Sequence, residues 1–181
     1  VTFFKFQPQT IMTPLAITMG CPAGIGPEII LKFFACSEDH LLPPCIVVGD
    51  LNVLRFYAQQ LGINCSIVPW LPGDDIPSGR NIIPLYESSK LSKNSIHPGT
   101  FTQETAIAMA SAITSAVKGI QQGWFSGLVT CPISKEALQE SKHHYPGHTE
   151  MLAKLTASNN QVMMLAGSSL RVTLATIHCG I

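Results

Sequence analysis

The sequence predicts an α/β fold, with a mostly parallel sheet and flanking helices. Two observations lead to this prediction. Short apolar runs alternate with segments of helical periodicity over the first two thirds of the chain. Apolar residues make up 46% of the 181 residues and charged residues only 12%, so the chain can bury an ordinary domain core.

The strands are predicted from short apolar runs that end at glycine, proline or polar residues. In chain order they are 15–19, 44–49, 65–70, 81–86, 125–130, 161–166 and 170–178. The last two flank the turn Gly167–Ser169 and are expected to pair antiparallel. The run that ends at His178 has the character of a core strand, so a chain ending at Ile181 is expected to be truncated, and a natural C-terminal strand is the alternative.

The helices are predicted where a capping residue precedes an apolar repeat of helical spacing. With the capping residue first, they are Asp50 with 51–61, Thr100 with 106–120, Ser134 with 135–140 and Thr149 with 150–157, and a further helix runs from Pro27 to Phe34. Thr100 and Gln103 have the spacing of a capping box. The polar segments 71–80 and 87–99 are predicted to be loops.

The charge balance limits the classes of partner. Eleven basic and 11 acidic residues cancel, so no broad basic surface for nucleic acid or anionic lipid is expected. No apolar run reaches the length of a membrane span.

The six cysteines include no C-x-x-C pair, which argues against a zinc ribbon or finger. Residues 1–10 contain Lys5 and Pro8 and lack the apolar core of a secretory leader. A cytoplasmic protein with reduced, mostly buried thiols is therefore expected. Met12 is a natural start for the domain, and residues 1–11 are assigned to a leader or to upstream sequence.

A glycine-rich loop follows the first predicted strand, with glycines at 20, 24 and 26. It matches neither the dinucleotide pattern G-x-G-x-x-G nor a P-loop. Glycines here could let backbone amides approach an anion at the helix start. Spacing alone favours a tight strand-to-helix turn without a ligand.

Three polar residues are candidate site residues by position: His148, Lys135 and His178. His148 precedes Thr149 at a predicted helix start, where an imidazole, a hydroxyl and backbone amides could bind an anionic group, although a local capping role is equally open. Lys135 follows a strand end and could reach a phosphate or carboxylate, or lie on a helix surface.

His178 ends a predicted strand, where ligands bind in open α/β sheets and where an imidazole suits a divalent metal ion. Periodicity alone favours a histidine with ordinary hydrogen-bond partners. His40 and His97 are expected in solvated loops, and the adjacent His143 and His144 point apart and are not expected to chelate one ion.

Five segments together resemble the PdxA family of 4-hydroxythreonine-4-phosphate dehydrogenases, and the resemblance runs from about Leu15 to the end of the chain. The segments are Gly20–Glu28 (GCPAGIGPE), Thr130–Lys135 (TCPISK), Tyr145–Glu150 (YPGHTE), Val162–Ala166 (VMMLA) and Leu170–His178 (LRVTLATIH). They occur in the order found in the family. The family usually has an acidic residue where Cys21 stands, and a thiol cannot reproduce the charge of a carboxylate.

The resemblance implies a function. Family members oxidise the C3 hydroxyl of 4-phosphooxy-L-threonine with NAD or NADP, and the product loses carbon dioxide to give 3-amino-2-oxopropyl phosphate for pyridoxal phosphate (vitamin B6) biosynthesis. A divalent metal ion (Zn, Mg or Co) acts as a Lewis acid. By resemblance, His148 and Thr149 contact the substrate and His178 binds the metal; the residues that bind the dinucleotide stay unassigned.

The resemblance also implies a two-domain fold like that of isocitrate and isopropylmalate dehydrogenases, and a homodimer with a shared active site. Residues 12–181 would be its N-terminal portion, and the absent C-terminal half would carry two further metal histidines. The chain alone is therefore expected to be inactive or nearly so. Two alternatives stay open: a sister dehydrogenase of phosphorylated threonate or erythronate, and a noncatalytic fragment that binds a phosphometabolite.

Overall fold

The computed structural model describes residues 13–36, 43–141 and 145–175. In chain order the elements are β1 (Leu15–Thr18), α1 (Gly26–Cys36), β2 (Cys45–Asp50), α2 (Leu51–Leu61), β3 (Ser66–Pro69), β4 (Ile82–Ser89), the short 3-10 helix η2 (Lys93–Ser95), α3 (Gln103–Gln121), β5 (Gly127–Thr130), α4 (Lys135–Glu140), α5 (His148–Leu155), β6 (Met164–Ala166) and β7 (Arg171–Thr173). None of the helices within these ranges is long and apolar enough to cross a bilayer.

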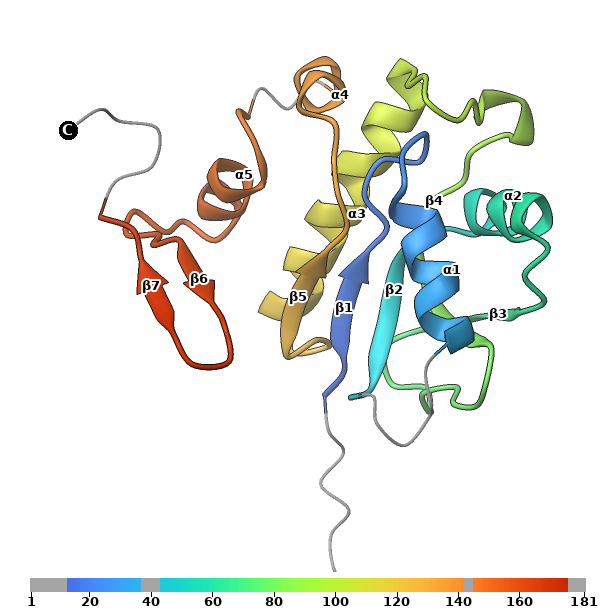
Figure 1. The fold of residues 1–181 in the computed structure, drawn as a ribbon, viewed down its shortest axis with the longest axis horizontal. Coiled ribbons are helices and arrows are strands. Elements are labelled where there is room, and N and C mark those ends of the chain that lie inside the picture. Colours follow the sequence, from blue (N-terminus) through green and yellow to red (C-terminus); the bar gives the residue numbers. More distant parts are fainter. Residues whose placement is uncertain (1–12, 37–42, 142–144, 176–181) are drawn as a thin grey trace, which may run out of the picture.

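A five-stranded sheet forms the centre of the fold, in the order β3-β4-β2-β1-β5. Every pair of neighbouring strands in it is parallel. Helices α1 and α2 cover one face and α3 covers the other (Figure 1). The α/β fold with a mostly parallel sheet, predicted from alternating strands and helices, is confirmed.

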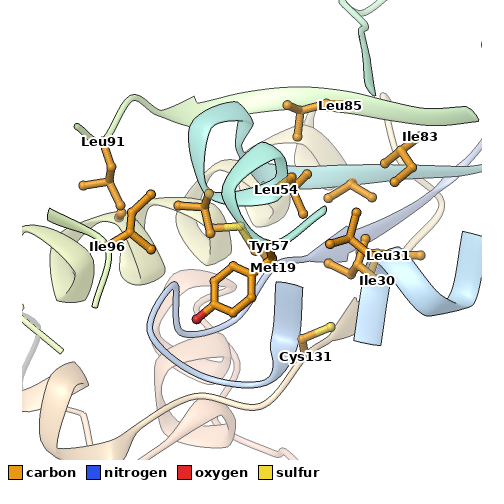
Figure 2. Packing of buried hydrophobic residues seen from close by; sticks show 14 of the residues in the cluster. Met19, Ile30, Leu31, Leu54, Tyr57, Ile83, Leu85, Leu91, Ile96 and Cys131 are labelled. Carbon is orange, nitrogen blue, oxygen red and sulfur yellow. The ribbon is translucent and has the colours of Figure 1, made fainter. Parts of the chain in front are cut away.

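Both faces of the sheet are buried, as parallel sheets require. Strand β2 is buried along its whole length. In β1, Ile17 packs toward α1 and α2, while Ala16 packs toward α3. Figure 2 shows the first of these layers, where Met19 lies close to Leu54 and Tyr57. Burying one large aliphatic side chain contributes about 1.5–3 kcal/mol, so these layers provide most of the stability.

Asp50 ends β2 and caps α2. Its Oδ1 accepts hydrogen bonds from the N–H groups of Asn52 (2.9 Å) and Val53 (3.2 Å), which confirms the predicted cap. Its Oδ2 accepts from Ser89 Oγ (2.9 Å) and from the N–H of Leu91 (2.7 Å), two contacts that the sequence pattern does not indicate. Through these four bonds one buried side chain connects two sheet strands and a helix.

Two predicted boundaries are wrong. The capping box of α3 is formed by Thr102 and Thr105, not by Thr100 and Gln103: Thr105 N–H donates to Thr102 Oγ1 (3.3 Å), and Thr102 N–H donates to Thr105 Oγ1 (2.8 Å). Strand β4 extends to Ser89, into a segment predicted to be a loop. Pairing with β2 keeps these polar residues extended, and Ser89 lies opposite Asp50.

The hairpin β6–β7 confirms the predicted antiparallel pairing, with Leu165 opposite Val172. Its expected place in a core is not observed. The apolar side chains of this region are 40–67% exposed: Val162, Met163, Met164, Leu165, Leu170 and Val172. The hairpin forms a separate two-stranded sheet beside the main one (Figure 1). The predicted continuation to His178 passes into residues 176–181, outside the described ranges.

The described cysteines are all free thiols. Cys21, Cys45 and Cys131 are buried, Cys65 is half-buried and Cys36 is exposed. The expected burial is therefore found for three of the five described cysteines, and Cys179 lies outside the described residues.

Candidate functional site

The carboxyl ends of β1 and β5 lie side by side, and β5 is the outermost strand on that side of the sheet. The chain leaves β1 toward α1 on one face, and it reaches β5 from α3 on the other face (Figure 1). The strand order therefore reverses between β1 and β5, which is where open α/β sheets form ligand crevices. The candidate site is built from the loops that follow these two strands.

Backbone hydrogen bonds hold the two loops together. Cys21 N–H donates to Pro132 O, and Cys131 N–H donates to Thr18 O, both over 3.1 Å. Gly20 has a positive φ of 74°, and a Cβ there would lie closer than 3.0 Å to Pro132 O. A Cβ at Gly26 would come still closer to Met19 O. These two glycines let backbone segments pack on each other, which supports the tight-turn interpretation.

The thiol of Cys21 lies between the same loops. Burial raises its pKa, while hydrogen bonding from the backbone at Ala23, Gly24 and Ser134 acts in the opposite direction. Backbone donors thus lie around this thiol, where they would favour a negatively charged group. A cavity of about 410 Å³ opens beside it, lined in part by Gly24, Ser134 and Glu136.

A second cavity, of about 330 Å³, lies beyond the end of β5. Its lining residues are Thr130, Cys131, Pro132, Ile133, Lys135, Gly147 and His148. It brings Lys135 and His148 together, although sequence position alone gave no reason to pair them. Thr149 is half-buried and does not line this cavity.

His148 is the first residue of α5, and Gly147 is the N-cap, without a side-chain hydrogen bond. The prediction that Thr149 caps this helix is therefore wrong, because the helix starts one residue before it. The Nε2 atom of His148 is buried and has no hydrogen-bond partner among the described residues. Burial lowers the pKa of His148, so its imidazole is neutral at pH 7.

Among the described residues, Cys131 and Lys135 also line this cavity, and Glu150 lies beside its lining residue Gly147. Burial raises the pKa of the Cys131 thiol to about 11, so it carries no charge at neutral pH. Lys135 is exposed and is the first residue of α4. Glu150 lies in the first turn of α5, and its carboxylate lies beside Gly147. A Cβ added to Gly147 would be 3.4 Å from Glu150 Oε2.

The metal assignment falls on His178, which lies outside the described residues, as do His40, His143 and His144. Within the described ranges, no three His, Cys, Asp or Glu side chains gather closely enough to bind a metal ion. These residues therefore do not fit a metal site by themselves. His97 is exposed, in accord with its expected loop position.

A further cavity of about 270 Å³ lies at the amino ends of β2 and β4. Phe34, Pro43, Ile82 and Pro84 contribute to its mostly apolar lining. It contains no charged side chain. Its one titratable lining group among the described residues is the Cys45 thiol, whose pKa is raised by burial, so the carboxyl edge of the sheet remains the candidate site.

Comparison with known proteins gives consistent matches. The model of the family described as pyridoxal phosphate biosynthetic protein PdxA matches residues 42–181. A 4-hydroxythreonine-4-phosphate dehydrogenase of Geobacter metallireducens is 39% identical over 164 residues, which cover 91% of this chain and 48% of that protein. The chain thus spans about half the length of such curated relatives.

Solved structures agree. A crystal structure of a 4-hydroxythreonine-4-phosphate dehydrogenase from Burkholderia phymatum superposes with a TM-score of 0.85 at 31% identity, covering 93% of this chain and 51% of that one. A terephthalate 1,2-cis-dihydrodiol dehydrogenase from Burkholderia xenovorans superposes with a TM-score of 0.70 at 26% identity, covering 93% and 49%.

Proposed function

Because the chain belongs to the PdxA family, we propose that it is the N-terminal half of a NAD(P)-dependent 4-hydroxythreonine-4-phosphate dehydrogenase. The reaction proposed is oxidation of 4-phosphooxy-L-threonine at C3, followed by decarboxylation to 3-amino-2-oxopropyl phosphate for pyridoxal phosphate biosynthesis. One observation carries the proposal. Two segments that resemble the family, 130–135 and 145–150, lie on either side of helix α4 and contribute to one cavity at the switch point of the sheet.

In this proposal His148 and Thr149 bind the substrate. A neutral imidazole can accept or donate a hydrogen bond to a hydroxyl group without adding charge. The half-buried position of His148 favours such a role. Few water molecules can reach the imidazole there, so water competes weakly with a ligand hydroxyl for its hydrogen bond. A bound divalent ion (Zn, Mg or Co) would supply Lewis-acid chemistry, with His178 as one of its ligands.

The proposal includes a cytoplasmic homodimer with a shared active site. The second half would supply the remaining metal histidines and the dinucleotide site. The chain alone is therefore expected to show little or no turnover.

The second candidate is a dehydrogenase of phosphorylated threonate or erythronate. It would use the same cavity and the same histidine. The similar structure from Burkholderia xenovorans carries the name of a dehydrogenase of another substrate, so this architecture serves more than one substrate.

The test joins this chain to the C-terminal half of the Geobacter metallireducens relative and measures formation of reduced nicotinamide. We expect turnover with 4-phosphooxy-L-threonine, a large loss in His148→Asn and little change in the exposed-loop control His97→Asn. Turnover with phosphorylated threonate or erythronate alone would favour the second candidate. A folded joined protein without turnover on any of these substrates would contradict a catalytic role.

A further inference from the structure

We propose that Lys135 binds an oxyanion of the substrate, a phosphate or a carboxylate, in the cavity that it shares with His148. The inference rests on the proposed function for the identity of the ligand. Among the described residues that line this cavity, Lys135 is the one lysine or arginine, and no aspartate or glutamate lines it. The lining therefore selects for a negatively charged group.

The backbone holds Lys135 at the cavity. Helix α4 begins at this residue, and Ser134 caps it by accepting a hydrogen bond from Ala137 N–H over 3.1 Å. Just before it, Pro132 O accepts from Cys21 N–H over 3.1 Å. The backbone of Lys135 is thus fixed between β5 and α4. Only its side chain must become ordered when an anion binds. This limits the entropy lost on binding.

No carboxylate competes for the ammonium group. Among the described residues Lys135 forms no ion pair, whereas Lys32 pairs with Glu28 on α1. Glu136, the next residue, lines the neighbouring cavity instead. Glu150 lies against Gly147 at the start of α5, so its negative charge opposes an anion at that helix start. The favoured place for the anion is therefore the Lys135 side of the cavity.

Lys135 and His148 would contact different groups of the same ligand. Lys135 supplies charge, and the neutral imidazole of His148 supplies a hydrogen-bonding group with no charge of its own. A ligand that carries both an oxyanion and a hydroxyl group satisfies both. Phosphorylated hydroxy acids belong to this chemical class.

The test follows the ring signals of His148 by NMR in the 181-residue chain while inorganic phosphate or, separately, acetate is added. We expect a saturable shift in the unaltered chain and a roughly tenfold or greater loss of affinity in Lys135→Met. Lys135→Arg should keep binding, and Lys154→Met, at the far end of α5, should not change it. Glu150→Gln should tighten it. The stronger of the two anions identifies the group that Lys135 binds.

Two results would overturn the proposal: unchanged affinity in Lys135→Met, or the absence of a saturable shift with either anion in the unaltered chain. Neither depends on turnover. Lys135-dependent anion binding in a joined protein that lacks dehydrogenase activity would keep the anion site and remove the proposed function. An active joined protein in which Lys135→Met leaves the KM for 4-phosphooxy-L-threonine unchanged would keep the function and remove the role of Lys135.

Discussion

The N–H of Leu91 donates a 2.7 Å hydrogen bond to the carboxylate of Asp50, which joins the segment after β4 to the start of α2. The same carboxylate oxygen accepts from Ser89 Oγ, and the other caps the helix. Asp50 is fully buried. Asp50 therefore joins the carboxyl ends of β2 and β4 to the start of α2.

Asp50→Ala should lower the free energy of unfolding by about 3–4 kcal/mol, because it removes a helix cap and leaves buried donors without acceptors. Ser89→Ala removes one of the four hydrogen bonds and should cost about 1 kcal/mol. Urea denaturation of the two variants measures the difference. Equal losses would show that the cap and the Leu91 bond contribute little.

Gly26→Ala should destabilise the chain by more than about 3 kcal/mol or prevent folding, since the added methyl group meets Met19 O at less than 3.0 Å. Gly24→Ala is the matched control in the same loop. Its Cβ would meet Cys21 Cβ at 3.3 Å, which a small shift can relieve, so a loss under about 1.5 kcal/mol is expected. Denaturation midpoints compare the two, and similar losses would contradict the close-packing role assigned to Gly26.

Cys21→Asp should be tolerated far better than Cys131→Asp. Hydrogen bonding from the backbone at Ala23, Gly24 and Ser134 would stabilise a carboxylate at Cys21, whereas burial is the sole cause of the raised pKa at Cys131. We expect a loss below about 2 kcal/mol for the first variant and about 4 kcal/mol or more for the second. Unfolding at pH 7 tests this. The reverse order would remove the assigned role of the backbone donors.

The free energy of unfolding should decrease as the pH is lowered, in part because His148 takes up a proton. In the unfolded chain its imidazole binds a proton near pH 6.5, whereas burial lowers its pKa in the folded chain. As pH falls below about 6.5 the unfolded state therefore takes up the proton first, and the free energy of unfolding decreases. Above about 6.5 this contribution is fully present.

His148→Asn should flatten that part of the pH profile relative to the unaltered chain. The charged side chains on the elements around His148 are Lys135, which lines the same cavity, and Glu150, in the same helical turn, whereas burial is the cause of its lowered pKa. His97→Asn serves as an exposed control. Parallel profiles for the unaltered chain and His148→Asn between pH 7 and 5 would contradict the burial of this imidazole.

The apolar side chains of the hairpin β6–β7 should make the 181-residue chain self-associate, since exposed apolar patches of this kind mark interaction surfaces. Val172→Lys places a charge on the face that also carries Leu165 and should reduce the association measured by sedimentation. Leu71→Lys, at an exposed loop position, is the control. Because both positions are exposed, neither change should lower the unfolding free energy by more than about 0.5 kcal/mol.

Local signals predicted the helix at Asp50 and the core strands correctly, because a side-chain cap and a wholly apolar run such as β2 leave few alternatives. They failed at Thr100, since Thr102 offers the same hydroxyl and lies closer to the first apolar residue of α3. Lys135 and His148 line the same cavity because of how α4 and α5 pack beyond β5. The spacing of residues in the sequence does not predict this packing. Apolar content likewise predicted burial for the hairpin without indicating what covers it.

The position of β1 has a consequence for folding during synthesis. It lies between β2 and β5, and the link between Pro14 and Ser126 joins residues 112 positions apart. At 5–20 residues per second a ribosome needs on the order of ten seconds to span that distance, so β1 emerges long before its second neighbour. One edge of this apolar strand therefore stays unpaired until β5 has been synthesised, and pairing across so many residues slows closure of the sheet.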